Sequence, residues 1–471
     1  MSRLRLSCLA AALAACSTAP TEPIDAAVGD DAEAPLDAPL ASDAGTPEPP
    51  PTRTTCEDSV EAVYAAVVEG TPTMEQRGEI VRCAYRGWIS QAEATTRLAT
   101  RGVAGVMPTS GVHQWLVAYR TTRRGDVPAL GTAEVLLPAM PATTPMRPLV
   151  AAHGTTGIAD VCAPSRVPGV SDYLALPWAA TGWAVIAPDY AGLGNAGVQG
   201  YGDNDDTGRS TLDAARALRA LLPADALDAR VVMTGHSQGG GAVLSAQALE
   251  PSYGAGGELA LVIPFAPGWA SGRSVDGYRF PAVPTSFGGG APAAIASIFL
   301  YAWASNTLGA ERAGEPFAAS VRAPVLEALE RDCVFMLASS LPSIAPTFGQ
   351  LLDETFRAGV VSCADGGPCS GAPSALWDWQ AANVLASAAG GAEVLLVTGT
   401  ADTLATPADV SCTVAHMTES GVTPRVCVDG STHFDVVERN TAFAMASASA
   451  MLDSADPPAC PGAGVLPACA R

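Results

Sequence analysis

The sequence predicts an α/β fold with a mostly parallel central sheet and helices on both of its faces. Three observations support this: strand-like apolar runs recur along the chain, helical stretches separate them, and one long interval contains no strand-like run. Several of the runs are apolar at nearly every position, which is typical of strands covered on both faces. We expect strands at residues 114–121, 132–137, 148–152, 183–187, 230–234, 259–264, 393–398 and 424–428.

The clearest helix between two strands is expected at Gly208–Leu222. Its Leu212, Ala215 and Leu218 recur at helical spacing and fall on one face. Strands that alternate with helices build a parallel sheet, because each connection must cross back over the sheet. One large α/β domain would account for most of the 471 residues.

The interval without strands spans residues 268–390, between the sixth and seventh expected strands. It holds only helical and loop-like segments, so we expect an inserted helical cap or lid. Its most apolar run, Ala291–Ala304, is shorter than a helix that crosses a bilayer. We favour a buried helix of the cap, and a lid helix that faces an oily surface is the alternative.

Apolar residues at helical spacing, such as Val60 and Val63, predict that residues 56–110 form an N-terminal helical segment. The other segments that we expect are an α/β core of residues 111–267 and 391–455, the cap of residues 268–390, and a disulfide-bearing tail of residues 456–471.

The composition sets limits on the partners of the chain. Hydrophobic residues make up 48% of it and charged residues 15%, so a substantial core can form. The net charge of −21 argues against nucleic acids and anionic membrane surfaces as partners, because both would repel the protein. The sequence does not indicate an oligomeric state.

Residues 1–15 have the features of a signal peptide, since Arg3 and Arg5 precede an apolar stretch too short to span a bilayer. This stretch ends in "LAAC", which resembles the lipobox of bacterial lipoproteins. That resemblance implies that Cys16 becomes lipidated and, with Ser17 following it, that the outer membrane is the partner.

The alternative for this region is ordinary cleavage at "ALA", Ala12–Ala14, which would leave a freely secreted protein. Residues 16–55 are rich in Pro and Ala, and eight acidic residues lie between Ser17 and Thr55. Such a segment cannot bury enough apolar surface to fold, so we expect a disordered tether.

Ten cysteines follow Cys16, and an even number in an exported chain predicts disulfides. No CxxC or HExxH motif occurs, so we expect neither a metal site nor a cofactor. Sequence proximity favours pairing Cys56 with Cys83, Cys363 with Cys369, Cys412 with Cys427, and Cys460 with Cys469, which leaves Cys162 for Cys333.

The motif "GHSQGG" places Ser237 directly after the apolar run that begins at Arg230 and directly before a helical stretch. A serine on a tight turn between a strand and a helix is the arrangement of a nucleophile elbow. Gly235 and Gly239 then have a physical reason, because a side chain at either position would meet the neighbouring strand or helix.

A serine nucleophile needs a histidine base, and in this kind of fold the order along the chain is Ser, acid, His. His433, in the loop after the last expected strand, is favoured over His416, which lies in an expected helix. We expect His113 and His236 to be structural, with His236 pointing away within the elbow, and His153 ends a strand.

Asp402, in the loop after residues 393–398, is the expected acid, and Asp435 is the alternative. Capping of the following helix is assigned instead to Asp409 or Thr406. An oxyanion hole needs two backbone N–H groups.

We expect one of these N–H groups from Gln238, the residue after the nucleophile. The other is expected from Thr155 in the loop "HGTTG", His153–Gly157.

Four stretches, "AHGTTGIADVCAPS", "GWAVIAPDYAGLGNAG", "GRSTLDAARALRAL" and "VVMTGHSQGGGAVLSA", together resemble the secretory lipase family of α/β-hydrolases, over residues 114–443. The resemblance implies an α/β-hydrolase fold, a triad of Ser237, Asp402 and His433, and a cap with a lid at residues 268–390. A Cys162–Cys333 bond would then tie the oxyanion loop to the cap.

The function implied is that of an exported lipase or carboxylesterase, which acts on an ester or lipid through an acyl-enzyme intermediate. Two alternatives remain. The same fold also carries peptidases and acyltransferases, and the chain could instead be an inactive binding protein displayed on the cell surface.

Overall fold

The computed structural model describes residues 46–67, 70–273, 276–279 and 290–469. The chain divides into two compact units, residues 1–44 and 45–471, and every described residue belongs to the second. The expected signal peptide, Cys16 and nearly all of the expected tether lie outside the described residues.

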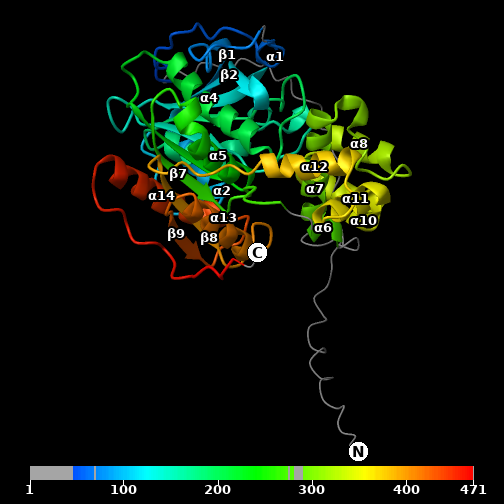
Figure 1. Ribbon diagram of the computed structural model, residues 1–471. Coiled ribbons are helices and arrows are strands. Elements are labelled where there is room, and N and C mark those ends of the chain that lie inside the picture. Colours follow the sequence, from blue (N-terminus) through cyan, green and yellow to red (C-terminus); the bar gives the residue numbers. More distant parts are fainter. Residues whose placement is uncertain (1–45, 68–69, 274–275, 280–289, 470–471) are drawn as a thin grey trace, which may run out of the picture. The chain divides into compact units, whose positions relative to one another are not determined.

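The described residues of the second unit form one sheet of nine strands in the order β1-β2-β3-β5-β4-β6-β7-β8-β9. Figure 1 labels strands from both ends of this order, β1 and β2 at one end and β7, β8 and β9 at the other. The pairs β1–β2, β2–β3 and β3–β5 are antiparallel. Every other neighbouring pair in this order, from β5–β4 to β8–β9, is parallel. The mostly parallel α/β fold is thus confirmed. The strands are β1 Ile80–Ile89, β2 Val112–Arg123, β3 Val127–Pro138, β4 Pro148–Ala152, β5 Ala184–Pro188, β6 Arg230–His236, β7 Glu258–Phe265, β8 Glu393–Gly399 and β9 Arg425–Asp429.

All eight expected strands are present, but the expectation of a helical segment at residues 56–110 is wrong in its middle. Helices α1 (Val60–Tyr64) and α2 (Gln91–Thr100) flank the strand β1, which pairs with β2 along its whole length. Two register shifts interrupt this pairing. Such bulges break the two-residue alternation of a strand. In the regular stretch between them, Cys83 and Ala84 are both buried, each in a different apolar cluster.

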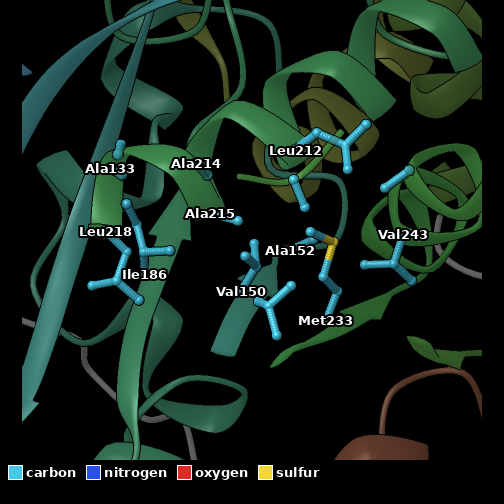
Figure 2. Packing of buried hydrophobic residues seen from close by; sticks show 14 of the residues in the cluster. Ala133, Val150, Ala152, Ile186, Leu212, Ala214, Ala215, Leu218, Met233 and Val243 are labelled. Carbon is cyan, nitrogen blue, oxygen red and sulfur yellow. The ribbon is translucent and has the colours of Figure 1, made fainter. Parts of the chain in front are cut away.

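Helices cover both faces of the sheet and bury an apolar cluster on each. Helices α4 (Asn204–Leu221) and α5 (Gln238–Tyr253) close one cluster. Figure 2 shows Leu212 and Leu218 of α4 among the strand residues of this cluster. Helices α2, α3 (Leu176–Ala179) and α14 (Val436–Leu452) contribute to the cluster on the other face, and α13 (Pro407–Glu419) adds residues to both.

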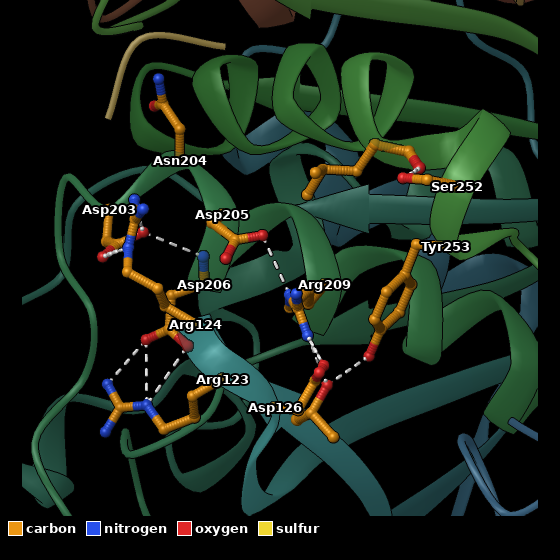
Figure 3. A network of polar contacts seen from close by, with 12 residues as sticks. Arg123, Arg124, Asp126, Asp203, Asn204, Asp205, Asp206, Arg209, Ser252 and Tyr253 are labelled. Carbon is orange, nitrogen blue, oxygen red and sulfur yellow. Dashed lines mark hydrogen bonds and ion pairs between the residues drawn. The ribbon is translucent and has the colours of Figure 1, made fainter. Parts of the chain in front are cut away.

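A network of ion pairs joins the turn between β2 and β3 to the start of α4 (Figure 3). Arg123 binds Asp206 through Nε and Nη2, with 2.7 Å from Nη2 to Oδ2. Arg124 binds both oxygens of Asp203 at 2.7 Å. Two-point contacts of this kind fix orientation as well as distance, so the network sets where α4 begins.

Arg124 Nη2 also donates to Asn383 Oδ1 at 2.9 Å. The buried Asn383 amide accepts from Asn204 N–H and donates to the Gly202 carbonyl oxygen, both at 2.8 Å. Asn383 follows α12 (Gly371–Ala382), the last helix between β7 and β8, where the chain returns to the sheet. The side-chain amide of Asn383 therefore fixes the end of α12 to the segments that carry Arg124 and Asn204.

The described residues between β7 and β8 form helices and no strand, and they build an apolar cluster of their own. The expected Ala291–Ala304 run lies in α7, and its Ile298, Leu300 and Trp303 are buried in this cluster. No helix in the described ranges is long and apolar enough to span a membrane. The helices are α6 Asp276–Arg279, α7 Ala291–Thr307, α8 Arg322–Arg331, α9 Val334–Ile344, α10 Phe348–Leu351, α11 Glu354–Ala364 and α12 Gly371–Ala382.

Five disulfides occur among the described residues, and three of the expected pairs are among them: Cys56–Cys83, Cys162–Cys333 and Cys363–Cys369. The pairings Cys412–Cys427 and Cys460–Cys469 are wrong; the bonds are Cys412–Cys469 and Cys427–Cys460.

The reason lies in the path of the tail, which runs back along β9 and α13. Gly464 N–H donates to the Val428 carbonyl oxygen at 3.0 Å, and Ser411 Oγ donates to the Pro467 carbonyl oxygen at 2.7 Å. Cys460 therefore bonds to Cys427 of β9 and Cys469 to Cys412 of α13, although Cys460 and Cys469 are nearer to each other in the sequence.

Glu134 of β3 is a buried carboxyl in the sheet. Gln114 Nε2 on β2 donates to its Oε1 at 2.9 Å. Burial raises the pKa of Glu134 from 4.5 to about 7, while the nearby Arg86 lowers it. The native state therefore holds this proton more tightly than the unfolded chain does.

The substitution Glu134→Gln should stabilise the protein at neutral pH. Because the folded pKa of Glu134 lies above its ordinary value, the unfolding free energy of the wild type falls as pH rises from about 4.5 to about 7. The variant does not lose stability in this way. Its unfolding free energy should therefore exceed that of the wild type by on the order of 3 kcal/mol above pH 7, and the difference should vanish below pH 4. Denaturant unfolding across this pH range measures it. Exposed Glu311→Gln is the control, and a pH-independent difference would contradict the prediction.

Candidate active site

Ser237 lies on the turn between β6 and α5, with the left-handed φ of 54°. The backbone is too crowded for side chains at the two elbow glycines. A Cβ on Gly235 would come within 2.1 Å of the Gly239 carbonyl oxygen, and a Cβ on Gly239 within 1.9 Å of the Ala152 carbonyl oxygen. Glycine at these positions lets α5 start directly against the end of β4.

Backbone hydrogen bonds fix the strained turn. Ser237 N–H donates to the Phe265 carbonyl oxygen at 2.9 Å, and the Ser237 carbonyl oxygen accepts from the N–H groups of Gly241 and Gly268 at 3.0 and 2.9 Å. A non-glycine residue at positive φ persists only where its surroundings hold it. Here β7 and the loop after it do so.

The structure brings Ser237, His433 and Asp402 together. His433 Nε2 lies 2.9 Å from Ser237 Oγ, and His433 Nδ1 lies 2.7 Å from Asp402 Oδ2. A carboxylate can only accept, so Nδ1 carries the proton and Nε2 is free to accept from the serine hydroxyl. The three residues come from loops at the carboxyl ends of β6, β8 and β9.

Asp402 is buried and both of its oxygens are used. Oδ1 accepts from the N–H groups of Leu404 and Ala405 at 2.8 and 2.9 Å, which leaves Oδ2 to face His433. Such double anchoring fixes the orientation of the carboxylate.

The alternative acid, Asp435, is used elsewhere. It accepts from the N–H and the hydroxyl of Thr432, at 2.6 and 2.7 Å, and pairs with Arg439. The expected cap of α13 is present, since Thr406 and Asp409 form a reciprocal capping box.

The expectation that His236 points away from the site is wrong. Its Nε2 donates to the His433 carbonyl oxygen at 2.8 Å, and the two imidazole centroids are 4.9 Å apart. Burial, together with the nearby His433, lowers the pKa of His236 to about 3. His236 is therefore neutral at physiological pH and holds the loop that carries His433 without adding a charge beside it.

The remaining histidines make structural contacts. His416 Nε2 bonds the Leu385 carbonyl oxygen at 2.8 Å, and His113 Nδ1 bonds Tyr85 Oη at 2.9 Å. Burial lowers the pKa of His153 to about 4, and its Nδ1 bonds the Gly154 carbonyl oxygen at 2.6 Å.

The loop after β4 approaches the serine turn. Gln238 is the first residue of α5, so its N–H is one of the groups that have no partner within the helix. Thr155 borders the same cavity as Ser237, and its Oγ1 bonds Tyr201 Oη at 2.7 Å. Val334 N–H donates to the Thr156 carbonyl oxygen at 2.8 Å, beside the Cys162–Cys333 bond.

A cavity of about 580 Å³ opens beside Ser237 and His433. Most of its wall is apolar, and Phe335, Met336 and Phe434 also reach the surface, being 64%, 61% and 54% exposed. Sequence reasoning missed three polar residues of this wall, Arg101, Tyr173 and Glu438. No motif marks them, because they come from three segments far apart in the chain.

No group of three or more histidine, cysteine, aspartate or glutamate side chains in the described ranges is placed to hold a metal ion.

The sheet order, the serine turn and the loops after β4, β8 and β9 define an α/β-hydrolase fold. A model of the secretory lipase family matches residues 168–268, which confirms the resemblance that the motifs predicted. The matched segment includes the serine turn, and the loops that carry Asp402 and His433 follow it in the chain.

Solved structures share the fold. The rice cell wall degrading esterase LipA from Xanthomonas oryzae is 18% identical, with 80% of this chain and 97% of that chain covered and a TM-score of 0.55. Candida antarctica lipase A in its closed state is 16% identical, with 84% and 86% covered and a TM-score of 0.57.

A putative hydrolase from Legionella pneumophila is also similar. It is 16% identical, with 80% of this chain and 97% of that chain covered and a TM-score of 0.61. A search among curated proteins finds no match.

The substitution Gly239→Ala should destabilise the protein. Its Cβ would lie 1.9 Å from the backbone oxygen of Ala152, and neither backbone can retreat without moving β4 or α5. We expect a loss of about 3 kcal/mol or more in unfolding free energy, measured by denaturant unfolding. Gly272→Ala, at an exposed position with open space around it, is the matched control. Equal stability of the two variants would contradict the steric argument.

Proposed function

We propose that the protein is an exported serine hydrolase that cleaves carboxylic esters, as a lipase or carboxylesterase. The observation that supports this most is the pair of hydrogen bonds that links Ser237 to His433 and His433 to Asp402, beside a largely apolar cavity. The match to the secretory lipase model and the fold shared with an esterase and a lipase support the same reaction class.

In the proposed mechanism, Ser237 Oγ attacks the ester carbonyl while His433 Nε2 takes the hydroxyl proton. Asp402 stabilises the imidazolium and keeps the ring oriented, because its own position is fixed by Leu404 and Ala405. His433 then gives the proton to the leaving alcohol. Water, activated by the same histidine, releases the acid from the acyl-enzyme.

The negative charge on the tetrahedral intermediate needs donors that are in position before the reaction. We propose the backbone N–H groups of Gln238 and Thr155 for this role. Gln238 begins α5, so the positive end of the helix dipole adds to its effect. The contact between Thr156 and Val334 and the Cys162–Cys333 bond hold the loop of Thr155 in place.

A peptidase or acyltransferase reaction would use the same three side chains, and an inactive binding protein would keep the fold without turnover. The hydrogen-bonded tautomer of His433 and the double anchoring of Asp402 favour an active site over a relic. The apolar wall of the cavity favours an ester with an alkyl acyl group over a peptide, whose polar backbone would lose its hydration there.

Ser237→Ala should lower kcat for nitrophenyl ester hydrolysis on the order of 10⁴-fold or more, and Asp402→Asn should cost on the order of 10⁴-fold. A series of acyl lengths, with and without an emulsion, separates a lipase from a carboxylesterase. Asp435→Asn is the matched control, because Asp435 bonds Thr432 rather than His433. Wild-type and Ser237→Ala proteins that are equally slow would refute the hydrolase.

We also propose that Cys16 carries a lipid anchor in the outer membrane. The sequence around it and the five disulfides are consistent with export. Metabolic labelling with a fatty acid should mark the wild type, and Cys16→Ser should abolish the label and release the protein. Cys8→Ser, within the signal peptide, is the control. An unlabelled wild type would favour cleavage at Ala12–Ala14 and a freely secreted protein.

A further inference from the structure

The wall of the cavity beside Ser237 has two chemically different parts. One part comes from α7 and the start of α9 and is apolar, with Ala291, Ile295, Val334 and Phe335 among its residues. An alkyl chain loses nothing by leaving water for such a surface. This part suits the acyl group of an ester.

The other part comes from α2, α14 and the short turn that contains Tyr173, and it carries two charged side chains. Arg101 caps the C-terminus of α2, and Glu438 lies in the first turn of α14. Tyr173 Oη accepts from Gly154 N–H at 3.4 Å, and its ring packs edge-on against His236. The charged part therefore adjoins the loop after β4, close to the serine turn.

Both charged groups keep hydrogen-bonding capacity for a ligand. Arg101 Nη2 donates to the Gly169 carbonyl oxygen at 2.7 Å, and a guanidinium has five N–H groups in all. Within the described ranges neither Arg101 nor Glu438 forms an ion pair within 4.0 Å. Burial raises the pKa of the Glu438 carboxyl, and a hydrogen bond from its own backbone N–H, together with the positive charge of Arg101, opposes that rise.

We propose that Arg101 and Glu438 form a subsite for a leaving alcohol that bears free hydroxyl groups, such as glycerol. This rests on the proposed ester hydrolase function. A hydroxyl both donates and accepts, so it can bond a carboxylate and a guanidinium at once.

The pair also selects against other alcohols. Because Arg101 and Glu438 carry opposite charges, an anionic or a cationic leaving group is attracted by one of them and repelled by the other, so it gains little from the pair. An alkyl leaving group would strip water from both charges without replacing it.

The test compares two esters with the same acyl group, glycerol monobutyrate and butyl butyrate, by the butyrate they release. The readout is kcat/KM for glycerol monobutyrate divided by kcat/KM for butyl butyrate. Arg101→Met and Glu438→Gln should each lower this ratio about tenfold, the loss expected for one hydrogen bond to a charged group. The change should appear mainly in KM for the glycerol ester.

Two matched controls lie on the same helices. Arg97→Met is one turn earlier on α2 and Arg439→Met adjoins Glu438, and neither residue borders the cavity. Both should keep the wild-type ratio. If Arg101→Met and Glu438→Gln both keep the wild-type ratio, the subsite is refuted. This holds whether their rates stay high or fall equally for both esters. A wild type that hydrolyses neither these esters nor nitrophenyl butyrate would instead refute the hydrolase itself.

Discussion

The close contact between Gly239 and the end of β4 is the constraint on which the site depends. A Cβ at Gly239 would fall 1.9 Å from the Ala152 carbonyl oxygen, so the start of α5 lies directly against β4. Strands β4 and β6 are parallel neighbours, and their loops leave the sheet at the same edge. The serine turn, the N-terminus of α5 and the loop after β4 therefore meet at one point. Ser237 keeps its unfavourable φ because backbone hydrogen bonds to Phe265 and Gly268 hold the turn in this position.

The same turn also supports the histidine. His236, next to Ser237, donates to the backbone of His433, while Asp402 holds the ring of His433 from its other nitrogen. His433 is thus fixed at its backbone by the end of β6 and at its side chain by the loop after β8. A neutral His236 serves this purpose better than a charged one, because a second positive charge 4.9 Å away would oppose protonation of His433.

The parts that sequence reasoning recovered are those that local chemistry determines. Buried parallel strands are apolar throughout, and a serine turn demands glycines at fixed positions, so both are visible in the sequence. Strand β1 is not visible in the sequence, because its bulges disturb the alternation of side chains that marks a strand. The tail disulfides depend on where residues 456–471 cross β9 and α13, which proximity in sequence cannot indicate. Arg101 and Glu438 are far apart in the sequence and border one cavity because α2 and α14 contribute to the same apolar cluster.

The helices between β7 and β8 are tied to the core at two points, at Cys333 before α9 and at Asn383 after α12. Cys333 is bonded to Cys162 in the segment after β4, and α9 starts at the next residue. The start of α9, which forms part of the apolar wall of the cavity, is therefore held against the loop of Thr155. A hydrogen bond from Val334 N–H to the Thr156 carbonyl oxygen joins the two segments as well. At the other end, Asn383 is hydrogen-bonded to Arg124 and Asn204. A movement of the helical region that widened the cavity near α9 would have to displace the loop of Thr155 as well, so the shape of this part of the apolar wall and the position of that loop are set together.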